Sequence, residues 1–250
     1  MFIENYLNVN YNIVMEDFQK KLENIQKEIV NPLYYFINNN KLDLIELIKN
    51  VFVTLFVRKE LVSCDIFKKL FNEIKNCPPQ VATLFRQEYV RYSYFPLCVE
   101  NILQLAHILK KYSNESIYEV AAGSGWLSFY LSRYGVGISK AIDNYSWDKL
   151  FEKELPIKVE REDAVEVIRN EKPSTVLINW PPPEDEFLVS CFEAMRKNSY
   201  LIVISDVDYK VTSNKLFFEN YKNQKLYEEK LKYSFPGFND TIKVYKKSIK

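Results

Sequence analysis

The order of hydrophobic and polar residues changes character about halfway along the chain. In the first part, apolar residues recur at spacings of three and four, which is the period of an amphipathic helix. Two adjacent prolines, Pro78 and Pro79, interrupt this pattern before it resumes. The spacing predicts an all-helical N-terminal subdomain over residues 1–115. Its helices are expected at 11–30, 41–57, 65–75, 81–92 and 96–111.

From residue 116 onward, short apolar runs alternate with amphipathic stretches. Strands separated by helices favour right-handed crossovers and a parallel, doubly wound α/β sheet. The last two runs have only a turn at Pro236 and Gly237 between them and predict an antiparallel hairpin. The 116–250 domain is thus expected to hold a mainly parallel, seven-stranded sheet with an antiparallel C-terminal strand. Strands are expected at 116–121, 138–142, 156–160, 174–179, 199–205, 225–235 and 240–247, and helices at 125–134, 146–154, 163–170, 185–197 and 212–221.

Composition narrows the class of protein. The chain has 250 residues, of which 47% are hydrophobic and 27% charged, so it can bury a core and is neither a disordered tail nor a disulfide-stapled miniprotein. With a formal charge of +1, the chain as a whole is not attracted electrostatically to nucleic acid or to an anionic membrane. A local basic groove stays an alternative. Lysines gather near the C-terminus, but Glu228 and Glu229 interrupt them, which favours a solvated hairpin. These lysines are Lys225, Lys230, Lys232, Lys243, Lys246, Lys247 and Lys250.

Metal and membrane sites are not expected. The four cysteines show no C-x-x-C spacing and His107 is the only histidine, which removes most zinc-ligand combinations. His107 lies in an apolar helical pattern, so packing is favoured over a role as general base. The N-terminal residues lack the basic patch and apolar run of a signal peptide, and the most apolar segment, 51–57, is bounded by charges. A cytoplasmic location without a membrane span is expected.

Glycine is concentrated at one place. Four of the five glycines lie between residues 123 and 137. Two of them belong to the sequence Glu-Val-Ala-Ala-Gly-Ser-Gly at 119–125, which begins in the first predicted strand and continues into the turn after it. Such a turn lets a ligand lie against bare backbone and a helix N-terminus. The alternative is a tight strand-to-helix connection that binds nothing.

This sequence resembles the glycine-rich motif E/D-x-G-x-G-x-G of class I S-adenosylmethionine-dependent methyltransferases, which have a Rossmann-like fold. Ala121 stands where the motif has its first glycine, and Ser128 stands where a dinucleotide-binding motif has its third. The resemblance implies S-adenosylmethionine as cofactor. The residues that it places around the methionine part are Glu119, Ala121, Ala122, Gly123 and Gly125.

Two acidic residues extend the resemblance. Asp143 directly follows the next predicted strand, where a doubly wound fold places a carboxylate for a ribose diol, and the resemblance places Asn144 beside the adenosine. Asp163 and Ala164 follow the third strand and resemble the Asp-Ala pair that contacts adenine in related methyltransferases. For Asp143 the alternative is a turn aspartate that caps a helix beginning near Ser146, and for Asp163 helix capping is an equally good explanation.

The fourth predicted strand ends in Asn179-Trp180-Pro181-Pro182 followed by a third proline. This stretch resembles the D/N/S-P-P-Y/F motif of methyltransferases that modify amino groups, and the resemblance implies that it orients the methyl acceptor. Prolines make the loop stiff and are expected to leave its carbonyls free as acceptors. The alignment is imperfect, because either Trp180 occupies the polar position or it is an insertion. An amino acceptor therefore stays one alternative.

The N-terminal half offers a substrate surface. Arg91, Tyr92 and Tyr94 lie in an aromatic segment where a ring could stack a planar substrate and the arginine could pair with an anion. A buried connector is the alternative. The sequence thus favours a methyltransferase with an unidentified acceptor, which could be a small molecule, a protein or a nucleic acid. A noncatalytic scaffold of the same fold is the second hypothesis, and a nicotinamide-dependent dehydrogenase is a third.

Overall fold

The computed structural model describes residues 15–37, 41–113, 115–146 and 155–248. The chain divides into two compact units, Met1–Val90 and Arg91–Lys250. This division comes earlier than the expected boundary at residue 115, because the last of the predicted N-terminal helices belongs with the sheet. Within the described residues, no helix is long and apolar enough to cross a membrane.

The first unit is helical, as the spacing of apolar residues predicts. Its core is a cluster of edge-to-face rings, in which Phe52 contacts Phe85 at 5.7 Å and Phe67 contacts Tyr89 at 5.7 Å between centroids. Two helices continue into π-helical turns. The elements are a helix over residues 15–25, then η1 (Gln26–Val30), α2 (Asn31–Tyr34), α3 (Leu42–Phe52), η3 (Val53–Val57), α4 (Cys64–Ile74) and α5 (Pro79–Val90).

The second unit is a seven-stranded sheet with the order β3-β2-β1-β4-β5-β7-β6. The five strands β1 to β5 are parallel, and β7 is antiparallel to both β5 and β6. This confirms the predicted α/β fold and its closing hairpin. The strands are β1 (Ile117–Val120), β2 (Ile138–Asp143), β3 (Glu160–Arg161), β4 (Thr175–Asn179), β5 (Tyr200–Asp206), β6 (Lys225–Lys230) and β7 (Asp240–Lys246).

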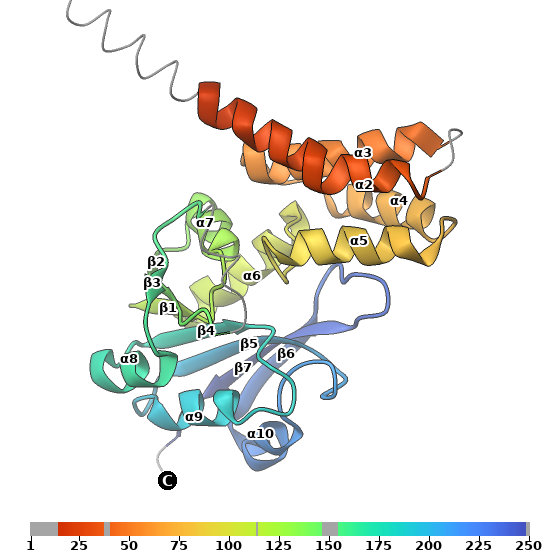
Figure 1. Ribbon diagram of the computed structural model, residues 1–250. Helices are drawn as coiled ribbons and strands as arrows, with labels where there is room; N and C mark the ends of the chain where they lie inside the picture. Colours follow the sequence, from red (N-terminus) through yellow and green to blue (C-terminus); the bar gives the residue numbers. More distant parts are fainter. Residues whose placement is uncertain (1–14, 38–40, 114, 147–154, 249–250) are drawn as a thin grey trace, which may run out of the picture. The chain divides into compact units, whose positions relative to one another are not determined.

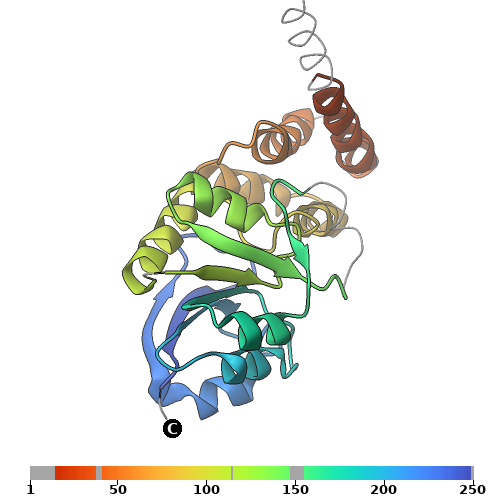
Figure 2. The same ribbon diagram turned by 90° about the vertical axis from the view of Figure 1, so that its left-hand side faces the viewer.

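Helices cover both faces of this sheet. Figures 1 and 2 show α8, α9 and α10 on one face, and α6 and α7 on the other. Val176 and Val203 of the sheet and Phe192 and Phe217 of the helices share one continuous core on the first face. The helices are α6 (Val99–Tyr112), α7 (Trp126–Arg133), α8 (Ala164–Glu171), α9 (Phe187–Ala194), α10 (Lys215–Asn220) and the short η5 (Lys222–Gln224).

Buried amides attach α6 to the sheet. Asn101 donates to the Tyr233 carbonyl at 2.9 Å and accepts from the Tyr233 N–H at 3.0 Å. Gln104 makes the same kind of pair, donating to the Lys230 carbonyl and accepting from the Lys232 N–H. Each amide thus pairs with a backbone N–H and a backbone carbonyl at the end of β6 or just after it, and the pair made by Asn101 is buried. These contacts explain why α6 belongs to the second unit.

The strand expected over 156–160 and the surroundings of Lys243 differ from the sequence-based expectations, and one expected helix is not tested by the described residues. The strand expected over 156–160 is reduced to Glu160–Arg161, because the residues before it turn their apolar side chains toward β2 and the glycine turn. The helix expected over 146–154 lies almost wholly outside the described residues. Lys243, expected on a solvated hairpin, is buried in the sheet with 4% of its surface exposed.

Candidate functional site

The turn between β1 and α7 has an unusual backbone. Ala121, Gly123 and Gly125 all have positive φ angles, of 54°, 55° and 75°. A residue with a Cβ atom rarely adopts this left-handed region, since the Cβ crowds the neighbouring carbonyl. Ala121 therefore holds the conformation that the first glycine of the motif would adopt freely. The turn closes with a hydrogen bond from the Gly125 N–H to the Ala122 carbonyl at 2.9 Å.

We expect Ala121→Gly to raise the free energy of unfolding slightly, by up to about 1 kcal/mol. The substitution relieves the left-handed strain, and the greater freedom of glycine in the unfolded chain offsets part of the gain. Urea denaturation of the two proteins would measure the difference. A clear loss of stability would mean that the Ala121 methyl group makes packing contacts worth more than the strain.

Asp143 faces the glycine turn. It is the last residue of β2, next to β1 in the sheet, and one carboxylate oxygen accepts the Gly123 N–H at 2.8 Å. The other oxygen accepts the Tyr145 N–H at 2.7 Å. The two hydrogen bonds fix the plane of the carboxylate, while each oxygen keeps a further lone pair for a ligand.

Glu119 is a buried carboxyl close enough to Asp143 to interact with its charge. It lies in β1 with 2% of its surface exposed, and it accepts a hydrogen bond from the hydroxyl of Ser128 on α7. Burial is the main cause that raises the pKa of Glu119, to about 7; the charge of Asp143 acts in the same direction, and the hydrogen bonds with Ser128 oppose the shift. Carboxyl groups whose pKa values are strongly shifted tend to cluster at functional sites, and Glu119 lies beside the glycine turn.

The two glycines of the turn differ in what surrounds them. A Cβ atom built on Gly123 would meet no atom of the described residues within 4 Å, so these residues leave its backbone open to a ligand. A Cβ atom on Gly125 would lie 2.7 Å from Val159 and 3.0 Å from Ile157. These two side chains, together with Tyr145, belong to a small apolar cluster beside the turn. Access is thus open at Gly123 and closed at Gly125.

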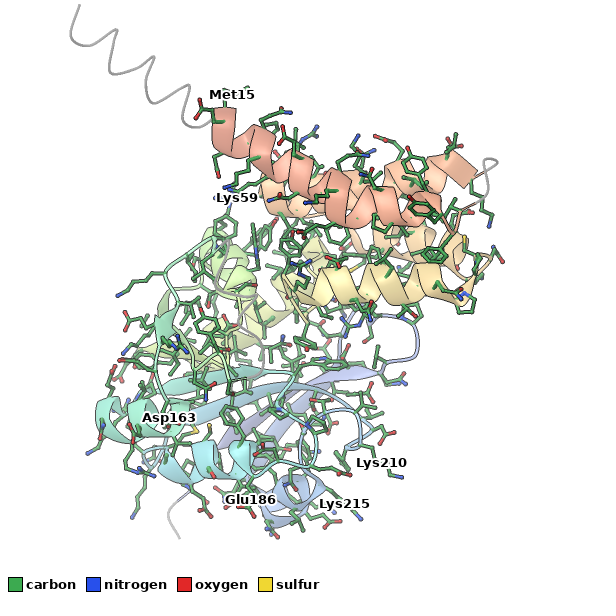
Figure 3. All side chains as sticks on the ribbon, in the orientation of Figure 1. Met15, Lys59, Asp163, Glu186, Lys210 and Lys215 are labelled. Carbon is green, nitrogen blue, oxygen red and sulfur yellow. The ribbon has the colours of Figure 1, made fainter. Side chains whose placement is uncertain are left out.

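Two of the predicted adenosine contacts serve the backbone. Asp163, labelled in Figure 3, is the N-cap of α8 and accepts the Glu166 N–H at 2.9 Å. Asn144 accepts the Ser146 N–H at 2.9 Å in a turn after β2. The capping alternative therefore describes an actual role of Asp163, and Ala164 is buried behind it as the first residue of the helix.

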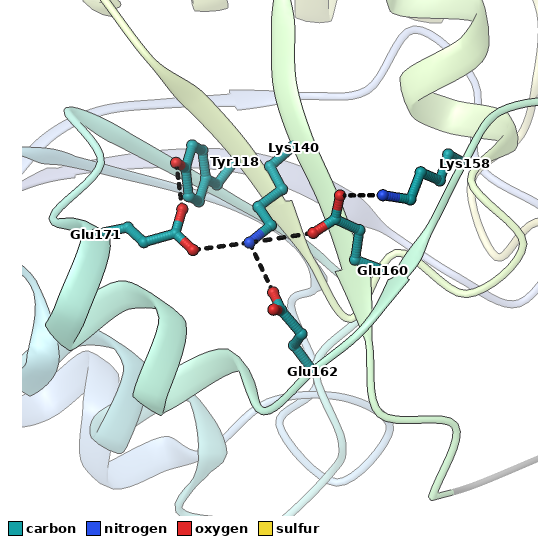
Figure 4. A network of polar contacts seen from close by, with 6 residues as sticks. All are labelled: Tyr118, Lys140, Lys158, Glu160, Glu162 and Glu171. Atoms are coloured by element: carbon teal, nitrogen blue, oxygen red, sulfur yellow. Dashed lines mark hydrogen bonds and ion pairs between the residues drawn. The ribbon is translucent and has the colours of Figure 1, made fainter.

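A charged network supports this end of the sheet. Figure 4 shows the Lys140 ammonium between three carboxylates, at 2.7 Å from Glu162, 2.7 Å from Glu171 and 3.2 Å from Glu160. The Tyr118 hydroxyl donates to Glu171 at 2.6 Å. Burial alone would lower the pKa of Lys140, but hydrogen bonds with Glu162, Glu171 and Glu160 raise it above the usual range of lysine. The network ties β2 to β3 and α8.

The proline loop follows β4, next to the glycine turn in the sheet. The side-chain oxygen of Asn179 is buried and has no hydrogen-bond partner among the described residues. The Pro181 carbonyl, which the sequence suggested would be free, accepts the Thr212 hydroxyl at 2.6 Å and the Ser213 N–H at 3.0 Å. The segment after β5 therefore holds the proline loop by two hydrogen bonds to the Pro181 carbonyl, which is not free to bind a ligand. Among these groups, Asn179 offers the unused acceptor.

Trp180 is held on several sides. Its φ angle is 54°, and its indole N–H donates to Asp240 of β7 at 2.9 Å. The ring stacks on Tyr94 with 5.7 Å between centroids and meets Phe238 edge-on at 5.0 Å. These contacts compensate for the strained backbone and fix the indole as a wall beside Asn179.

The segment before α6 reaches both loops. The Ser124 hydroxyl of the glycine turn donates to the Tyr92 carbonyl, and Tyr94 stacks on Trp180. Tyr94 keeps 38% of its surface exposed, and Arg91 is partly buried. The structure thus brings the predicted Tyr92 and Tyr94 to the edge of the sheet where Asp143 and Asn179 lie.

Sequence reasoning missed several residues of this site. Ser128 stands where a dinucleotide-binding motif has a glycine, a pattern that does not indicate that its hydroxyl donates to Glu119. Asp240 and Thr212 lie far along the chain from the residues that they contact, Trp180 and Pro181. One sequence signal bears on the contact between Trp180 and Asp240. It is the predicted antiparallel last strand, which pairs with β5 beside the proline loop.

No family model and no curated protein matches the sequence. Solved structures of similar fold include the N-methyltransferase NodS from Bradyrhizobium japonicum WM9, 8% identical with a TM-score of 0.44, where the match covers 59% of this chain and 93% of that one. Another is a SAM-dependent O-methyltransferase from Thermotoga maritima, 12% identical with a TM-score of 0.42, covering 61% of this chain and 67% of that one. The order of the strands and the antiparallel β7 give the chain a Rossmann-like fold with an antiparallel last strand, as the sequence predicted.

Proposed function

We propose that the protein is an S-adenosylmethionine-dependent methyltransferase. The observation that carries this proposal is the Asp143 carboxylate, which is held by the Gly123 N–H at the edge of the sheet beside backbone that is open to a ligand. A carboxylate in this position can accept from both hydroxyls of a ribose. The acceptor of the methyl group is not identified.

The residues present fit the cofactor. The open side of Gly123 gives room for a ligand against the main chain, and Asp143 keeps one lone pair on each oxygen. Asp143 supplies negative charge near a group that would carry a sulfonium and an ammonium. Bound S-adenosylmethionine supplies a methyl group activated by its positive sulfur.

The protein's own contribution to such a transfer is orientation and exclusion of water. An in-line displacement needs the nucleophile in near-attack geometry in a dry site. Trp180 and Tyr94 form an apolar wall, and Trp180 is fixed by Asp240. The buried oxygen of Asn179 can accept one N–H or O–H of the acceptor and so direct its lone pair.

An amino group as acceptor rests on Asn179 in this proposal. In the motif that the loop resembles, a proline carbonyl joins the polar side chain in binding the amino group. Here the Pro181 carbonyl is occupied by Thr212 and Ser213, so the second hydrogen bond would need another partner. The proposal therefore extends to acceptors that donate a single hydrogen bond.

We expect Asp143→Ala to weaken S-adenosylmethionine binding by about 10- to 150-fold, since the charge-assisted hydrogen bonds lost are worth roughly 1.5 to 3 kcal/mol. Isothermal titration calorimetry would measure the affinity, with circular dichroism to check the fold. Asp65→Ala, which removes an exposed acid from the helical unit, is the control and should bind normally. Unchanged affinity in a folded Asp143→Ala protein would remove Asp143 from the site.

A noncatalytic scaffold is the second candidate function, and two observations favour it. Ala121 holds a strained left-handed backbone where the motif has glycine, and the Pro181 carbonyl is used internally. Titration of the intact protein with S-adenosylmethionine and with NAD up to millimolar concentration would distinguish the candidates. Binding of neither nucleotide would support the scaffold, and binding of NAD alone would support a dehydrogenase.

A further inference from the structure

We propose that the opposite edge of the sheet, where β4 and β5 begin, binds single-stranded nucleic acid. The site is a tyrosine–lysine patch. It does not include the residues proposed for methyl transfer, and its binding does not depend on that function. The patch consists of Lys111, Tyr112, Tyr200, Tyr227 and Lys246.

Three elements bring the tyrosines together. Tyr112 ends α6, Tyr200 is the first residue of β5, and Tyr227 lies in the edge strand β6. The Tyr112 ring centroid lies 5.9 Å from that of Tyr200 and 6.1 Å from that of Tyr227. The rings are tilted by 52° and 43°, so Tyr112 does not stack face to face on either neighbour. All three side chains are partly exposed. Half-exposed rings of this kind can stack unpaired bases.

Cations lie among these rings. The Lys111 ammonium is 5.1 Å from the Tyr112 centroid and 5.4 Å from the Tyr227 centroid, and the Lys246 ammonium is 5.8 Å from the Tyr200 centroid. Neither lysine makes an ion pair within the part of the chain that the structure describes. Both are therefore available to phosphate groups.

Further cations continue the patch along the same edge. The Asn198 N–H donates to the Lys247 carbonyl, which places the loop carrying Lys197 beside the end of β7. The side chain of Gln224 accepts the Ser248 N–H at 2.8 Å. This contact places η5, which carries Lys222, beside the residues that follow β7. Lys197 and Lys222 are exposed. A chain of phosphates could thus contact successive lysines from β6 to the start of β5.

The helix macrodipole does not account for this charge. Helix C-termini favour basic residues, and this explains Lys111 in the last turn of α6. Lys246 lies in a strand and Lys197 lies in a loop, where the dipole of a helix gives no such preference. Because the whole chain has a formal charge of only +1, the accumulation is local to this edge.

The aromatic rings favour nucleic acid over an anionic membrane. Lysines alone would suit either polyanion. A membrane surface is usually bound by an amphipathic helix that inserts its apolar face, whereas the patch offers half-buried tyrosines at the ends of strands. Rings interleaved with cations match alternating bases and phosphates of a flexible strand. Double-stranded nucleic acid would keep its bases from stacking on these rings.

The first test uses fluorescence anisotropy of the full-length protein with a short labelled oligouridine at low salt. We expect the Lys111→Ala/Lys246→Ala double variant to bind about tenfold more weakly, with the slope of log affinity against log salt reduced by about 1.4. The matched control is Lys210→Ala/Lys215→Ala, which removes two cations elsewhere (Figure 3) and should bind like the natural protein. Circular dichroism would check that each variant is folded.

The second test separates stacking from charge. Tyr112→Leu removes a ring without changing the charge, and we expect it to bind oligouridine about 5- to 100-fold more weakly. Tyr112→Phe keeps the ring and should bind normally. The same proteins would be tested against vesicles of phosphatidylserine and phosphatidylcholine.

Three results would overturn the proposal. The first is no binding of oligouridine by the natural protein at low salt. The second is equal weakening by the patch variants and by the Lys210→Ala/Lys215→Ala control. The third is binding to the anionic vesicles without binding to oligouridine, which would identify the patch as a membrane contact.

Discussion

Replacing the buried Lys243 by methionine is expected to stabilise the protein by about 2 kcal/mol at neutral pH. Lys243 lies in the middle of β7 with 4% of its surface exposed. Its ammonium donates to the hydroxyls of Ser205 and Thr241 and lies 5.0 Å from the ring centroid of Phe218. Methionine fills a similar volume without the cost of burying a charge, and even buried ion pairs are often replaced by hydrophobic residues with no loss of stability or a gain of about 1 to 4 kcal/mol.

The cost of burying the Lys243 charge should also make the stability of the protein depend on pH. Burial lowers the pKa of Lys243 from 10.5 to about 8, although Glu228, Asp206 and Asp240 oppose the shift. Between these two pH values the unfolded chain binds more protons than the folded protein, so stability rises with pH through this window. The full rise corresponds to about 3 kcal/mol and is lost again as the pH falls through the folded pKa.

Urea denaturation between pH 7 and pH 9.5 would measure both effects. The natural protein should gain stability over this range, and Lys243→Met should lack that part of the gain. Lys230→Met, which replaces an exposed lysine of the neighbouring strand, is the control and should follow the natural protein. A Lys243→Met protein that is less stable at pH 7 would show that the two hydroxyl contacts outweigh the buried charge.

The architecture was largely predictable because its signals are local. Strand and helix patterns after residue 116 alternate regularly, and the closing hairpin has a turn at Pro236 and Gly237. Short β3 was predicted too long, because 156–159 resembles a strand in its apolar content but packs against the glycine turn. The unit boundary was not predictable from α6 itself. Its assignment depends on Asn101 and Gln104 reaching chain segments more than a hundred residues away.

The site was predictable where one motif carries all its parts. The glycine turn and Asp143 are adjacent once the strand order is known, and their hydrogen bond follows from that order. The proline loop was less predictable, since the groups that occupy Pro181 come from the segment after β5. Lys243 illustrates the same limit, because its sequence neighbours suggest a solvated strand and only the packing of Phe218 shows its burial.

The second large effect is expected at Gly125, where alanine should lower the free energy of unfolding by about 3 kcal/mol. Two causes add together. The left-handed backbone, with φ of 75°, costs about 1 to 2 kcal/mol with a Cβ atom. The new methyl group would also lie 2.7 Å from Val159 and 3.0 Å from Ile157, and such overpacking typically costs 1 to 3 kcal/mol.

Gly123 provides the matched comparison in the same turn. Its φ of 55° imposes a similar backbone strain, but a Cβ atom there would meet nothing within 4 Å in the part of the chain that the structure describes. Gly123→Ala should therefore cost only about 1 to 2 kcal/mol. Val159→Ala should make room for the methyl group, so that the Gly125→Ala/Val159→Ala double variant loses less stability than the sum of the single variants. Equal losses at the two glycines, or strict additivity in this cycle, would mean that Val159 does not close the turn at Gly125.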